Sequence, residues 1–186
     1  GGPLDWLTPF ALLTGCALVV GYALIGATWL VLKTDGEVEA RARRLGAKLL
    51  LGLLAAIATV SVWTPLAVPR IAERWFRMPD FAWYALVPLA TGIAAFACWR
   101  GLRSGRPLLP FLASVALFLL AYVGLVISNV PYLVPPVLDV WEAAADPKTQ
   151  MFMLVGVLIL LPIILGYTVF NYWVFRGKVR AGEGYH

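Results

Sequence analysis

Five long apolar stretches divide this chain, and its charges are gathered in the connections between them. Of the 25 Asp, Glu, Lys and Arg residues, only Lys48 lies inside a stretch, close to its start. The stretches cover residues 9–32, 45–64, 81–99, 108–128 and 151–174. A bilayer core about 30 Å thick needs about 20 apolar residues in helical form, and each stretch reaches or nearly reaches that length. The sequence therefore predicts an all-α fold, a polytopic transmembrane helical bundle with five membrane spans.

The composition supports a membrane protein and excludes several soluble classes. Hydrophobic residues make up 61% of the chain and charged residues only 13%, which is unusual for a soluble domain. The net charge of +5 does not indicate nucleic-acid binding, because Lys and Arg collect beside the cytoplasmic ends of membrane spans. We expect residues 1–186 to form a single membrane domain, with membrane lipid and no nucleic acid as partners.

The basic residues are distributed unevenly between alternate connections. One set of connections holds eleven of them: Lys33, Arg41, Arg43, Arg44, Lys48, Arg100, Arg103, Arg106, Arg176, Lys178 and Arg180. The other set holds four: Arg70, Arg74, Arg77 and Lys148. Because cytoplasmic loops are enriched in Lys and Arg, we expect the N-terminus outside the membrane and the C-terminus in the cytoplasm.

The first basic connection has the pattern of a helix start. Residues 34–37 read Thr-Asp-Gly-Glu, which matches a capping box in which the Thr and Glu side chains satisfy free backbone N–H groups. Two acid–base pairs follow at the i,i+4 spacing of a helix: Glu37 with Arg41, and Glu39 with Arg43. We expect the second helix to begin near Asp35 and to enter the membrane near Leu45. The charged turn is interpreted as solvated structure and not as a ligand site.

The two connections on the other side differ in character. Arg70, Arg74 and Arg77 recur at helical spacing between prolines, which favours a short helix in the membrane interface. Residues 129–148 carry Pro131, Pro135 and Pro136 followed by three acidic residues, and prolines fix φ. This segment is expected to form a structured acidic cap.

Within the spans, three features predict details of packing. Pro162 should kink the fifth helix, because proline removes one backbone hydrogen bond. Small residues four positions apart favour close helix contact: Ala17 with Gly21, and Ala23 with Ala27. Aromatic residues near the ends of the spans are typical of interface anchors: Trp6, Phe10, Tyr167, Phe170, Tyr172 and Trp173.

The residues that usually perform chemistry in membranes are scarce. Haem iron is normally held by His, Cys, Met or Tyr, but the single histidine is the last residue, His186. Cys16 lies about 25 Å of helix from the end of its span, and Cys98 about 3 Å from the end of its own. If those ends share one side of the membrane, the thiols are too far apart for a disulfide. Met151 and Met153 lie at the edge of the fifth span. We therefore expect these cysteines and methionines to pack against lipid or other helices and not to ligate a haem iron.

No metal-ligand spacing, phosphate-binding loop or catalytic triad is present. We therefore assign no catalytic, cofactor-binding or metal-binding residue. The residues alone indicate a scaffold or partner bundle rather than a self-sufficient enzyme.

Several motifs, taken in their order and spacing, resemble the second subunit of the bd-type ubiquinol oxidases. Near the N-terminus the chain has a Pro-Phe start at 9–10, a Gly-Ala-Thr-Trp segment at 26–29 and a Lys-Thr-Asp-Gly-Glu loop at 33–37. Later come Val-Pro-Tyr-Leu-Val-Pro-Pro at 130–136, Trp-Glu-Ala-Ala at 141–144, Leu-Pro at 161–162 and Tyr-Trp-Val-Phe-Arg-Gly-Lys-Val at 172–179. The last segment is most similar to the cyanide-insensitive branch. Residues 71–110 add little beyond their hydropathy.

The resemblance implies membership of a respiratory complex that oxidises quinol and reduces oxygen to water. In that family, haems b and d and the quinol-oxidising loop belong to subunit I, and subunit II is a haem-free partner that in some members holds a structural quinone. The family subunit has more than five spans, so this chain is expected to be its C-terminal portion, in the bacterial plasma (inner) membrane. Residues 33–36 match the family loop but are interpreted as helix-end structure, and no functional residue is carried over.

Two other functions fit the residues. A small transporter or channel module would need a polar or broken helix at mid-membrane, and Pro162 followed by Gly166 is the one candidate. An assembly partner would differ from an accessory subunit only in leaving the finished complex.

Overall fold

Five helices of the structure are long and apolar enough to cross a membrane, as the sequence predicts. The computed structural model describes residues 2, 4 and 7–178. The predictions for Trp6, Arg180 and His186 lie outside the described residues. The chain divides into two compact units, one built mainly from Gly1–Ser128 and the other from Asn129–Lys178.

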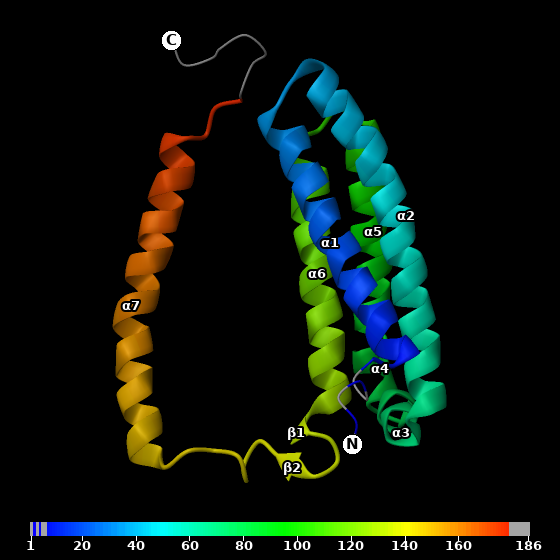
Figure 1. Cartoon of the computed structure of the whole chain (residues 1–186), viewed down its shortest axis with the longest axis vertical. Helices are drawn as coiled ribbons and strands as arrows, with labels where there is room; N and C mark the ends of the chain where they lie inside the picture. Colours follow the sequence, from blue (N-terminus) through cyan, green and yellow to red (C-terminus); the bar gives the residue numbers. More distant parts are fainter. Residues whose placement is uncertain (1, 3, 5–6, 179–186) are drawn as a thin grey trace. The chain divides into compact units, whose positions relative to one another are not determined.

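The first unit contains four of the five spans (Figure 1). In chain order its helices are α1 (Pro9–Lys33), α2 (Gly36–Ala67), α3 (Pro69–Phe76), α4 (Phe81–Tyr84), α5 (Leu86–Arg103) and α6 (Leu108–Asn129). The short helix α4 and helix α5 together form the third span, Phe81–Arg103. In Figure 1, α1, α2, α5 and α6 run side by side, and the core of the unit lies between them.

Helix α1 begins where local chemistry favours a helix start. The Thr8 side chain accepts a hydrogen bond from the Ala11 backbone N–H at 3.1 Å, and Pro9 occupies the first helical position, where it needs no N–H partner. The buried face of α1 comprises Gly21, Leu24, Ala27, Thr28 and Val31. Leu24, Leu50 of α2 and Leu117 of α6 are almost fully buried at the centre of the core.

One of the two predicted small-residue rows contributes to packing through both its members. Gly21 is buried and Ala17 is half-buried, and a Cβ on Gly21 would lie 3.8 Å from the side chains of Leu53 and Phe118. In the other row Ala27 is buried but Ala23 is exposed. The first pair therefore marks a contact face, whereas the second pair does so only through Ala27.

A buried pair of hydroxyl groups joins α1 to α6. The side-chain oxygens of Thr28 and Ser114 lie 2.9 Å apart, and both residues are at least 98% buried. Each hydroxyl also lies within hydrogen-bonding distance of carbonyl groups of its own helix, at Leu24 and Ile25 for Thr28 and at Phe111 for Ser114. The pair thus links two helices at a position where water is excluded.

We expect Thr28→Val to weaken this link without collapsing the unit. Valine keeps the volume but cannot hydrogen-bond to Ser114, and interhelical side-chain hydrogen bonds in membranes average about 0.6 kcal/mol. A double-mutant cycle with Ser114→Ala, measured as the free energy of unfolding in mixed micelles, should give a coupling energy of that size. A coupling of zero would show that the two hydroxyl groups satisfy only their own helices.

The capping box predicted at 34–37 is wrong. Thr34 follows the end of α1, and its hydroxyl donates to the Leu30 carbonyl at 2.7 Å. Asp35 is the N-cap residue of α2 but makes no side-chain capping bond. The turn is so tight that Thr34 remains bonded to the helix it ends, and Gly36 adopts φ = +68°, a conformation that favours glycine. The predicted helix start near Asp35 is confirmed.

The predicted short helix is present as α3, and it is fastened to the end of α6; its location in the membrane interface stays a prediction. The Arg74 guanidinium donates to the Ile127 carbonyl at 3.1 Å, and the Trp75 indole N–H donates to the Ser128 hydroxyl at 3.0 Å. A cation near the last carbonyls of a helix is favourable because those carbonyls carry partial negative charge. These contacts fix α3 across the C-terminal turn of α6.

The second unit combines a small hairpin with the fifth span. Strands β1 (Tyr132–Val134) and β2 (Leu138–Asp139) pair antiparallel, and the Asp139 carboxylate accepts from the Trp141 and Glu142 backbone N–H groups. The predicted structured acidic segment is confirmed, with a hairpin that the sequence did not indicate. The fifth span is α7 (Pro147–Val174), which begins with Asp146 as a capping residue.

Helix α7 is apolar around its whole circumference and has no buried residue. Pro162 lies inside the helix, and the kink it should cause stays a prediction. The predicted aromatic anchors Tyr167, Phe170, Tyr172 and Trp173 are all accessible on its C-terminal half. A helix with this profile is typical of a membrane span that faces lipid or another membrane protein.

Candidate functional site: a polar junction at one end of the first unit

A partly buried ion pair lies at the end of the first unit where α2 begins. Arg43 and Glu39 approach to 2.6 Å, and their side chains are only 18% and 21% exposed. The Arg43 Nε atom also donates to the same carboxylate oxygen at 2.9 Å. The sequence predicted this pair from its i,i+4 spacing, and the structure confirms it.

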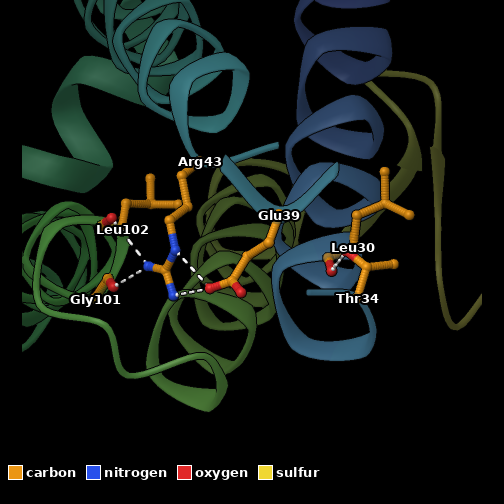
Figure 2. A network of polar contacts seen from close by, with 6 residues as sticks. All are labelled: Leu30, Thr34, Glu39, Arg43, Gly101 and Leu102. Atoms are coloured by element: carbon orange, nitrogen blue, oxygen red, sulfur yellow. Dashed lines mark hydrogen bonds and ion pairs between the residues drawn. The ribbon is translucent and has the colours of Figure 1, made fainter. Parts of the chain in front are cut away.

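Arg43 reaches beyond its own helix to the end of α5. One of its terminal nitrogens donates to the carbonyls of Gly101 and Leu102 at 3.1 and 3.0 Å. Figure 2 shows the guanidinium group between Glu39 on one side and these two carbonyls on the other. We call this set, namely Glu39, Arg43, Gly101 and Leu102, the polar junction.

The electrostatics of the polar junction are complementary. The last carbonyls of a helix have no intrahelical partner and carry partial negative charge. The Arg43 guanidinium therefore stabilises the C-terminal end of α5, while Glu39 balances its charge in a place with little water. The other predicted pair, Glu37 with Arg41, is formed at 3.0 Å, but both side chains are at least 74% exposed. Only one of two similar sequence patterns thus joins two helices.

The close approach of α5 and α6 positions the polar junction. A Cβ on Gly101 would lie 2.6 Å from the Pro110 Cδ and 2.8 Å from the Pro110 nitrogen. Next to this contact, the buried Cys98 thiol donates to the Pro110 carbonyl at 3.7 Å. On the other side Gly46 of α2 leaves room for Leu102, whose Cδ2 would lie 3.2 Å from an added Cβ. Glycines on two helices thus allow the chain to pack tightly around the junction.

The residues that the sequence considered as metal or haem ligands are not brought together. Cys98 is buried in the core and Cys16 is exposed, and both thiols are free. Met151 and Met153 lie on α7, where each is more than 60% exposed. Among the described residues, no group of three or more His, Cys, Asp and Glu side chains could hold a metal ion.

The polar junction is suited to fixing helices and not to reacting with a substrate. Its carboxylate and guanidinium satisfy each other, and its carbonyls are already hydrogen-bonded. Sequence reasoning predicted the Glu39–Arg43 pair but missed its partners, which lie 58 and 59 residues further along the chain. A basic residue in the first turns of α2 and a glycine near the end of α5 were the available signals, and neither is specific.

Comparison with known proteins agrees with the family resemblance found in the sequence. The family of cytochrome bd terminal oxidase subunit II matches residues 1–175. The cytochrome bd-I ubiquinol oxidase subunit 2 of Escherichia coli K12 is 27% identical over 218 aligned residues, and the match covers 98% of this chain and 56% of the relative. The proteins of the same description from Escherichia coli O6:H1 and O157:H7 give the same values. The chain spans about half the length of the curated relatives it matches.

Proposed function

The chain belongs to the cytochrome bd terminal oxidase subunit II family, and from this premise we propose that it is a haem-free accessory subunit of a bd-type quinol:oxygen oxidoreductase. It is a multi-pass membrane protein with five apolar helices. Its partner would be the haem-bearing subunit I, to which the role of catalysis belongs. The family match over residues 1–175 is the observation that carries the proposal.

The scarcity of buried haem-ligand donors among the described residues of this chain supports the assignment of haems b and d to the partner. An axial ligand must present a His, Cys, Met or Tyr atom to the iron. The spans contain no histidine, and the Cys98 thiol is packed in the core against the Pro110 carbonyl.

The structure suggests what an accessory subunit contributes. In the first unit the helices are joined by the polar junction at one end, by the Thr28–Ser114 pair inside, and by Arg74 at the end of α6. Such fastening gives a rigid wall that can hold a partner's cofactors in place and exclude water from them. The all-round apolar surface of α7 offers further area for lipid or for the partner, and a structural quinone is part of the same proposal.

The proposal includes the location and orientation of the chain. We place it in the bacterial plasma membrane, with the N-terminus outside and the C-terminus in the cytoplasm. The eleven-to-four distribution of basic residues between alternate connections supports this orientation. Labelling of single cysteines introduced at Lys148 and Arg106 in intact cells tests it, because only the first should react with an impermeant reagent.

Deletion of this chain is expected to abolish the oxidase complex. Membranes lacking it should lose the haem absorbance and the quinol oxidase activity of the complex, and a plasmid copy should restore both. Purification from native membranes should give the chain and subunit I in equal amounts, which distinguishes a lasting subunit from an assembly factor. A chain that purifies alone, with oxidase activity unaffected by its removal, would contradict the proposal.

A further inference from the structure

Positive charge is concentrated at the end of the first unit that contains the polar junction. Residues 33–48 and 100–106 contain eight basic and three acidic residues, a surplus of five positive charges. Residues 68–80, at the other end, have a surplus of only one. Two of the eight basic residues, Arg41 and Arg43, are neutralised by Glu37 and Glu39. These two ion pairs leave the surplus of positive charge unchanged.

Five of these basic side chains are directed to the surroundings of the protein. The residues are Arg44, Lys48, Arg100, Arg103 and Arg106, and all five are exposed. In the part of the chain that the structure describes, none of the five takes part in an ion pair or a side-chain hydrogen bond. Arg74, at the opposite end, instead donates to a helix carbonyl. The five exposed cations have capacity for an anionic ligand from outside the chain.

Tryptophan rings hold two of the cations of this end at a defined depth. The Arg103 guanidinium lies 4.4 Å from the centre of the Trp99 ring, and the Lys33 ammonium lies 5.2 Å from that of Trp29. In both pairs the basic residue follows the tryptophan by four positions, so its Cα lies one turn, about 6 Å, closer to the helix end, while its charged group lies over the ring. The second unit contains a cation–π pair of the same kind, in which the Arg176 guanidinium lies 5.0 Å from the centre of the Trp173 ring.

The tryptophan partners of these cations suggest how deep the cations lie in a bilayer. Tryptophan prefers the boundary between the hydrocarbon and the headgroups, and the headgroup layer on each side is about 5–8 Å thick. If Trp99 lies at this boundary, the Arg103 guanidinium beside its ring is within reach of the lipid phosphates. A guanidinium stacked on a ring keeps the N–H groups of its rim available, in the geometry that suits a phosphate.

We propose that Arg100, Arg103 and Arg106, with Trp99, form a binding surface for the phosphate of an anionic phospholipid. Clustered bases beside membrane helices recognise anionic headgroups, and the polar junction keeps this end of α5 in place through Arg43. The neighbouring exposed bases Arg44 and Lys48 on α2 add to the positive potential. This inference does not depend on the function proposed above, because it rests on the charges and geometry of this chain alone.

The test compares two double variants that each remove two exposed positive charges. Arg103→Gln with Arg106→Gln changes the proposed surface, and Arg77→Gln with Lys148→Gln is the matched control on other connections, where both residues are also exposed. Protein isolated from its native membrane with the partners it retains is delipidated and titrated with phosphatidylglycerol or phosphatidylcholine in mixed micelles. Bound lipid is counted by native mass spectrometry.

We expect the unmodified protein to prefer phosphatidylglycerol and the first double variant to bind it at least tenfold more weakly, at about fivefold per lost cation. The control should bind as the unmodified protein does. Equal losses in both double variants, no preference for phosphatidylglycerol, or complete displacement by inorganic phosphate would each overturn the proposal. If the first double variant unfolds, the same titration is carried out on Trp99→Leu. This variant keeps every charge and should still weaken phosphatidylglycerol binding.

Discussion

Gly101→Ala is expected to destabilise the protein strongly, although it adds only one methyl group. The added Cβ would lie 2.6 Å from the Pro110 Cδ, 2.8 Å from the Pro110 nitrogen and 3.2 Å from the Leu109 Cβ. A proline ring and a backbone nitrogen cannot rotate away, so the ends of α5 and α6 must move apart. Overpacking of this kind costs about 1–3 kcal/mol and occasionally more. We expect a fall of several degrees in the melting temperature of the detergent-solubilised protein.

Gly92→Ala is the matched control for this prediction, because Gly92 lies in the same helix and a Cβ there would meet no atom within 4 Å. Alanine is a better helix former than glycine by about 1 kcal/mol, so this variant should be neutral or slightly stabilising. Equal melting temperatures for the two variants would show that α5 and α6 are not held as closely as described.

The location of the spans could be predicted from the sequence because it depends on local properties. The length of an apolar run and the position of the charges that flank it determine where a helix can cross a membrane. For that reason the predicted stretch 108–128 differs from α6 (Leu108–Asn129) by a single residue. The start of α2 and its two ion pairs were predictable for the same reason, since each depends on residues within one or two turns.

The packing of the spans could not be predicted in the same way. In a soluble helix the apolar face points to the core, but lipid is as apolar as a protein core, so these spans are apolar on every side. The sequence of α5 does not show that Cys98 and Leu102 are buried while Phe96 and Trp99 are exposed. The family resemblance predicted the class of protein, and it gave no information about these contacts.

The polar junction could be predicted from the sequence only in part. The spacing of Glu39 and Arg43 predicted an ion pair, and the same reasoning predicted an equal pair for Glu37 and Arg41. Only the fold distinguishes them, because it buries the first pair against the carbonyls at the end of α5 and leaves the second in solvent. The prediction that the Thr34 hydroxyl caps α2 was wrong because this hydroxyl stays hydrogen-bonded to α1. The pattern at 34–37 does not indicate which of the two helices the hydroxyl will bond.

Arg43→Met is expected to cost about 1.5–3 kcal/mol of unfolding free energy, the range measured for hydrogen bonds to charged groups. Methionine keeps much of the apolar stem, so the loss comes from the Glu39 carboxylate and the two α5 carbonyls rather than from a cavity. Arg41→Met is the control, because an exposed i,i+4 pair contributes only about 0.3–0.5 kcal/mol.

Two further variants separate the contributions to this loss. Arg43→Lys should restore only part of the stability, because a single ammonium group cannot reach the Glu39 carboxylate and both carbonyls with the planar geometry of arginine. Glu39→Gln combined with Arg43→Met should cost less than the sum of the two single changes, since the double variant leaves no unpaired charge. Chemical unfolding in mixed micelles measures these variants together with the single Glu39→Gln change. Additive losses for Glu39 and Arg43, or a loss for Arg41→Met as large as that for Arg43→Met, would mean that the polar junction does not hold α2 to α5.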